Sequence, residues 1–110
     1  MAATKEDAAL MVQLLQFGAQ IELQEAMSHL FQPGFDPEQA SLRDKPVATV
    51  LGFGEAVATF VKQGVLDRGL VEDLLWIDGM WSKVGPAGKR AREEAGEPRL
   101  YENFEALAKG

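Results

Sequence analysis

Residues 46–61, with the sequence PVATVLGFGEAVATFV, predict a long helix with a broad buried face. Their apolar side chains recur every three or four positions and form two neighbouring stripes. One stripe contains Val47, Leu51, Gly54, Ala58 and Val61, and the other contains Val50, Phe53, Val57 and Phe60. Gly54 lies inside the first stripe, where the missing side chain lets another helix approach closely despite a propensity cost of about 1 kcal/mol. Pro46 suits the start of this helix and Gly64 its end.

The segment before it predicts another long helix, from about Thr4 to Phe31. This is the first predicted helix of the chain, and the helix at residues 46–61 is the second. Thr4 and Asp7 have the spacing of a capping box at its start. Two apolar stripes follow, one of Leu10, Leu14, Phe17 and Ile21 and one of Met11, Leu15, Leu23, Met27 and Leu30. We therefore expect neighbouring helices to cover this helix on more than one side. Residues 32–34 should end it, and residues 36–45 should form a connector containing a short turn of helix.

The C-terminal half predicts a third long helix and a short final one. Asp67 can cap the third helix, in which Leu70, Leu74, Ile77, Trp81 and Val84 have heptad-like spacing. Gly85-Pro86 should kink or break it, with residues 87–95 continuing as a charged helix. Pro98 is expected to open the final helix, whose inward side chains are Leu100, Phe104 and Leu107.

These segments predict an all-α fold, namely an antiparallel helical bundle of three long helices plus a short C-terminal helix. The short links between the segments favour antiparallel neighbours. A chain of 110 residues suits a single domain, spanning residues 1–110, because two domains would each be too small to bury a useful core.

Composition narrows the functional classes. The chain has no cysteine, which excludes disulfides, a thiolate zinc site and a cysteine nucleophile, and it favours the cytoplasm. No signal peptide or membrane-spanning run is visible, so we expect a soluble protein with no membrane partner. The net charge of -6 disfavours direct binding to nucleic acid. Five basic and three acidic residues lie between Lys83 and Arg99, and we expect this stretch to pair internally with the acidic helices.

Few residues suggest catalytic chemistry. Di-metal helical bundles use two Glu-x-x-His motifs, whereas His29 is the only histidine and Glu25 precedes it by four residues, so we predict no metal and no cofactor. His29 should lie near the end of the first helix, where the helix dipole favours it. Glu55 lies in the apolar middle of the second helix. It is either an acid or base with a raised pKa or, as we prefer, a residue that pairs with an arginine such as Arg92 or is simply exposed.

Several segments resemble one family. They are residues 51–55 (LGFGE), residues 61–66 (VKQGVL), Trp81 and, most distinctively, the tail at residues 96–105 (GEPRLYENFE). From Val47 to Glu105 the chain resembles an uncharacterised bacterial family of small all-helical proteins, a domain of unknown function. Arg92 resembles a family position as well, and it could form a buried ion pair with Glu55 or Glu105. The resemblance implies a helical fold and brings no established activity.

One surface of the third predicted helix indicates a contact with another protein. Trp76, Gly79 and Met80 share a face with charged residues that differs from the inward stripe, and tryptophan and methionine are enriched at interface cores. The alternative is that the first helix covers both large side chains. We therefore predict a protein-interaction or structural module that binds another protein or itself as a homodimer. Two rival functions are a small-ligand or metal-dependent enzyme with Glu55 and His29 in the bundle interior, and an acidic regulator of a nucleic-acid-binding protein.

Overall fold

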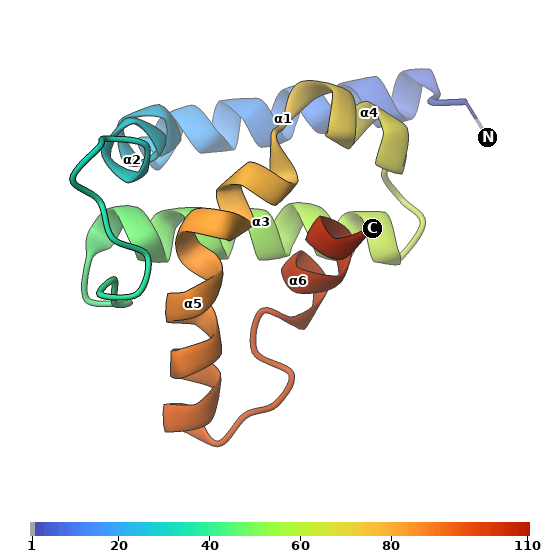
Figure 1. The fold of residues 1–110 in the computed structure, drawn as a ribbon. Coiled ribbons are helices and arrows are strands. Elements are labelled where there is room, and N and C mark those ends of the chain that lie inside the picture. Colours follow the sequence, from blue (N-terminus) through green and yellow to red (C-terminus); the bar gives the residue numbers. More distant parts are fainter. Residues whose placement is uncertain (1) are drawn as a thin grey trace.

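The structure is a computed structural model that describes residues 2–110, and it confirms the predicted all-helical class. Its helices are α1 (Lys5–Gln20), α2 (Leu23–Leu30), α3 (Lys45–Lys62), α4 (Arg68–Leu74), α5 (Ile77–Ala95) and α6 (Glu102–Lys109), and residues 2–110 form no strand (Figure 1). None of these helices combines the length and the apolar character that a bilayer crossing needs.

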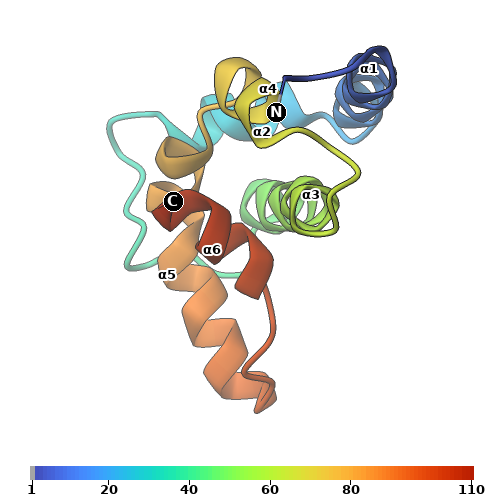
Figure 2. The ribbon, with the colours of Figure 1, turned by 90° about the vertical axis from the view of Figure 1, so that its right-hand side faces the viewer.

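Helix α3 is the central element, and α2, α5 and α6 all pack against it. Helices α1 and α3 run in opposite directions, but α5 crosses α3 rather than running along it (Figures 1 and 2). Helix α6 lies in the corner between α3 and α5. The arrangement therefore differs from the predicted bundle of three long antiparallel helices, because two of those helices are each divided in two.

The first predicted helix is broken at residues 21 and 22. Glu22 adopts a left-handed conformation, with φ 60° and ψ 42°, between α1 and α2. The turn gives α2 a direction of its own, and its buried residues Ala26 and Leu30 pack against α3. The N-terminus of α1 follows the prediction, since Thr4 and Asp7 form a capping box. Asp7 also accepts a hydrogen bond from the Asp67 N–H at 2.9 Å, which ties α1 to the start of α4.

The third predicted helix is broken at residues 75 and 76. Asp67 caps α4 as expected, by accepting a hydrogen bond from the Leu70 N–H at 2.9 Å. Leu75 is extended, and α5 starts afresh at Ile77. The break changes which side chains face inward, so Leu74 is exposed although the heptad pattern predicted it inside.

Of the kink or break predicted at Gly85-Pro86, the break does not occur, since α5 continues through both residues. Tight packing supports this part of the helix. A Cβ atom at Gly85 would lie 2.7 Å from the Trp81 indole, and one at Gly88 would lie 3.1 Å from Leu51 of α3. The contact within α5 and the contact with α3 accompany a helix that tolerates the hydrogen bond that proline cannot donate.

Two other boundaries also differ. The final helix begins at Glu102 rather than Pro98, and residues 36–44 form turns without helix. The stop after α3 follows the prediction: Gly64 has φ 77°, and the Val65 N–H donates to the Phe60 carbonyl at 3.1 Å, as in a Schellman motif.

Phe104 of α6 occupies the centre of the core. Its ring is fully buried and meets the Trp81 ring edge-to-face, with centroids 5.0 Å apart. The ring lies directly on Gly54 of α3, where any Cβ atom would overlap it. The close approach predicted at Gly54 is therefore confirmed, and the element that approaches is the C-terminal helix.

Gly54→Ala should destabilise the fold by about 1–3 kcal/mol, the usual cost of forcing an extra methyl group into a packed core. Gly52→Ala is the matched control, because Gly52 is exposed on the same helix and a Cβ atom there meets nothing within 4 Å. The control should stabilise the protein by up to about 1 kcal/mol, since alanine is the better helix former. Urea unfolding measures both. Equal effects at the two positions would contradict the packing of Phe104 on Gly54.

Candidate functional site

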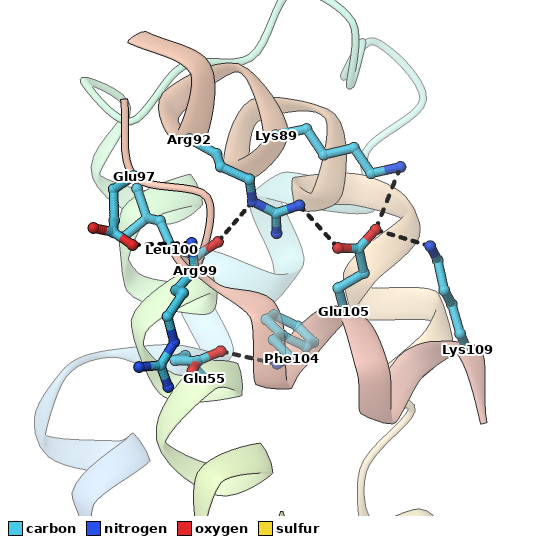
Figure 3. Close-up of polar contacts among 9 residues, drawn as sticks. All are labelled: Glu55, Lys89, Arg92, Glu97, Arg99, Leu100, Phe104, Glu105 and Lys109. Carbon is cyan, nitrogen blue, oxygen red and sulfur yellow. Dashed lines mark hydrogen bonds and ion pairs between the residues drawn. The ribbon is translucent and has the colours of Figure 1, made fainter. Parts of the chain in front are cut away.

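Glu55 caps the N-terminus of α6. Its Oε1 atom accepts a hydrogen bond from the Phe104 N–H at 2.8 Å (Figure 3). Tyr101, the residue at the N-cap of α6, is left-handed and provides no side-chain hydrogen bond, so a carboxylate from α3 takes over this role. A negative charge at a helix N-terminus is also favoured by the helix dipole. Asn103 adds a second link to α3 by donating to Thr59 Oγ1 at 3.0 Å.

Arg92 of α5 holds the tail from the other side. Its Nε atom donates to the Leu100 carbonyl at 3.0 Å, and its Nη1 atom donates to Glu105 at 3.0 Å (Figure 3). Both side chains of this ion pair are largely buried. Of the two partners proposed for Arg92, the structure selects Glu105, because Glu55 is directed at the Phe104 N–H.

Glu105 is surrounded by three cations. Besides Arg92, it lies 2.9 Å from Lys109 and 3.8 Å from Lys89. The hydrogen bond from Lys109, followed by that from Arg92, lowers the pKa of Glu105 below its ordinary value. The carboxylate therefore stabilises the fold above that ordinary value, and this contribution is lost as the pH falls through the lowered pKa.

Internal pairing of the basic stretch is also confirmed. Arg90 lies 3.8 Å from Glu38 and donates to the carbonyl groups of Pro37 and Ala40. Arg99 pairs with Glu102 at 2.8 Å, and Lys89 and Arg92 pair with Glu105. These arginines and lysines thus fasten the connector and the tail to the rest of the fold.

The predicted patch of Trp76, Gly79 and Met80 is divided by the structure. Trp76 is 64% exposed, whereas Met80 is only 1% exposed and belongs to the core. The indole of Trp76 lies across Gly79, so this glycine is covered and offers no approach to another helix. Placing Met80 and Gly79 on the outer surface was therefore wrong, because the break before α5 turns both inward.

Phe31 and Lys83 complete the surface around Trp76. Only Phe31 was missed in the sequence, since Lys83 is one of the charged residues predicted on the same face. The Trp76 ring is stacked on Phe31, with centroids 5.4 Å apart and an interplanar angle of 22°. The ammonium group of Lys83 lies 5.2 Å from the centroid of the Phe31 ring, within cation–π range. We call Trp76, Phe31 and Lys83 the aromatic platform. It joins the end of α2 to the start of α5, a proximity that depends on the two helix breaks.

The residues of the enzyme hypothesis lie in different places. Glu55 faces α6, whereas His29 is exposed in the last turn of α2, as expected for its position, and meets Phe35 edge-to-face. Among residues 2–110, no three His, Asp or Glu side chains are grouped so as to hold a metal ion. The geometry therefore supports structural roles for Glu55 and Arg92.

The predicted family resemblance is confirmed. The family model described as "Domain of unknown function (DUF4760)" matches residues 3–110. The match includes α1 and α2 as well as the region from Val47 to Glu105 that carried the resemblance. No curated protein and no solved structure matches the chain.

Glu55→Ala should lower the free energy of unfolding by about 1–2 kcal/mol, because it leaves the N-terminus of α6 without its cap. Glu55→Gln should retain most of the stability, since an amide oxygen still accepts the Phe104 N–H. Hydrogen exchange at the Phe104 amide, measured with urea unfolding, checks both variants. An unchanged exchange rate in Glu55→Ala would show that this hydrogen bond does not hold α6.

Proposed function

We propose that this chain, which belongs to the family of domains of unknown function DUF4760, is a protein-interaction module that binds its partner through the aromatic platform. The observation that carries the proposal is the state of Trp76, whose large apolar side chain is mostly exposed and yet fixed in place. Stacking on Phe31 and contact with Gly79 hold the indole on the surface.

A fixed, exposed tryptophan suits protein recognition for two reasons. Tryptophan contributes disproportionately to binding energy at interfaces, chiefly when it becomes fully desolvated. Ordering a free side chain on binding costs about 0.5–1.5 kcal/mol, and an indole that is already held in place avoids much of this cost. The aromatic platform is therefore pre-organised for binding.

The surroundings of Trp76 favour a partner with basic side chains. Trp76 lines a hollow of about 210 Å³ together with two carboxylates, Glu72 and Asp78, and one cation, Lys109. An arginine or lysine of the partner can stack on the indole and pair with these carboxylates. The net charge of -6 would also steer a basic partner toward this surface.

Neither rival function is supported by a comparable feature. The Glu55 carboxylate accepts the Phe104 N–H, which gives it a structural role instead of a free position in a cavity. The acidic-regulator hypothesis rests on the charge of -8 outside residues 83–99, since the net charge is -6 and this stretch carries +2, and it identifies no surface.

Trp76→Ala should abolish co-purification of the partner from the source cell while leaving the thermal unfolding midpoint nearly unchanged, because most of the side chain is exposed. Val65→Ala is the matched control, since Val65 is a large apolar side chain exposed elsewhere, just after α3. The control should retain the partner. Loss of the partner in both variants, or retention in both, would refute the role of the platform. A large loss of stability in Trp76→Ala would instead make the residue part of the core.

A further inference from the structure

A hollow lies on the surface between α3 and α6 and contains no residue of the aromatic platform. The two helices lie side by side (Figure 2), and the hollow between them has a volume of about 360 Å³. Sites for small ligands typically have volumes of about 300–1,000 Å³, so the size suits a small molecule. We call it the α3–α6 hollow. Its lining comes from the segment 58–62 of α3, from Arg68 at the start of α4 and from the segment 102–107 of α6.

Apolar side chains form much of this lining. Ala58 and Leu107 belong to the core, Val61 is half-buried and Ala106 is exposed. Ala58 and Ala106 come from the two neighbouring helices, and both are too small to fill the space between them. An apolar group that entered this space would lose contact with water, which favours its binding.

The charged residues of the lining are two cations, Lys62 and Arg68, and one carboxylate, Glu102. Glu102 is already paired with Arg99 at 2.8 Å. Lys62 makes no ion pair with any residue in the range 2–110. Arg68 pairs with Glu72 through its Nε atom at 3.3 Å, which leaves its two Nη groups for another acceptor. The two cations and the one carboxylate add up to a charge of +1, whereas the hollow beside Trp76 has two carboxylates and one cation.

We propose that the α3–α6 hollow binds a small carboxylic acid. The apolar body of the ligand lies against Ala58 and Ala106, and its carboxylate lies between Lys62 and Arg68. Guanidinium and ammonium groups form charge-assisted hydrogen bonds with carboxylates, and a single negative charge matches the charge of +1 in the lining. This site is separate from the aromatic platform, so either proposal can hold without the other.

Hexanoate is a suitable probe, because it combines a short apolar chain with one carboxylate. Titration of the labelled protein, followed by nuclear magnetic resonance, should shift the amide signals around Lys62 and Asn103 to saturation. Hexanamide has the same chain without the charge, and it should bind at least about threefold more weakly because it loses the charge-assisted hydrogen bonds. Acetate has the charge without the chain, and it should bind at least about tenfold more weakly because it buries little apolar surface.

Two variants test the two parts of the site. Ala106→Leu keeps the charges and puts a larger apolar side chain into the hollow, so it should abolish saturable binding of hexanoate. Lys62→Gln removes one cation and should weaken hexanoate binding at least about threefold. Lys45→Gln is the matched control, because Lys45 is an exposed lysine at the other end of α3. The control should leave the binding of hexanoate unchanged.

Thermal unfolding checks that each variant is folded, and Lys62→Gln decides the matter if Ala106→Leu is not. Absence of saturable shifts with hexanoate would overturn the proposal. Equal affinity of hexanoate for Ala106→Leu and the original chain would overturn it as well. If hexanamide bound as tightly as hexanoate, or if Lys62→Gln and Lys45→Gln had the same effect, the carboxylate would not be recognised by the cations of the hollow.

Discussion

The contact of Phe104 with Gly54 and Glu55 is the interaction on which the rest of the structure depends. Two adjacent residues of α3 recognise one residue of α6 in different ways: Gly54 makes room for its ring, and Glu55 accepts its backbone N–H. The same ring also meets Trp81 of α5. Three helices, α3, α5 and α6, are thereby held together at one point, and a shift of α6 toward or away from α3 would disturb the packing of all three.

Polar contacts around the tail also stabilise the docking of Phe104 on α3. Arg92 connects α5 to the Leu100 carbonyl and to Glu105, so the loop before α6 and α6 itself are fastened to the same side chain. These contacts give the short segments that resemble the family, LGFGE and GEPRLYENFE, a shared physical basis: they are the two halves of one docking contact.

The sequence predicted the helices of the core better than their connections. The close approach at Gly54 could be predicted because a glycine inside an apolar stripe leaves space that only a neighbouring element can fill. The break at Glu22 was missed because neither glycine nor proline marks it. The buried positions did carry a signal of the break. In a single helix of 3.6 residues per turn, Ala26 and Leu30 would lie roughly 100° around the axis from Met11, Leu14 and Gly18, so the two sets would not share one face.

The remaining errors have related causes. Pro86 did not break α5, in which Trp81 lies over Gly85 and Gly88 packs against Leu51 of α3. Met80 was placed outside because the heptad pattern was carried across the break at residues 75 and 76, which restarts the helical phase. The role of Glu55 could be narrowed to a structural one, but its partner is a backbone N–H, which no side-chain pattern reveals.

A double-mutant cycle of Gly54→Ala and Phe104→Leu tests the central contact most directly, because leucine keeps an apolar side chain but removes the ring that lies on Gly54. We predict that Gly54→Ala is much less damaging when position 104 is leucine, with a coupling free energy of about 1 kcal/mol or more between the two changes. Additive effects, within the ~0.3–0.5 kcal/mol typical of independent sites, would contradict the central role of this contact.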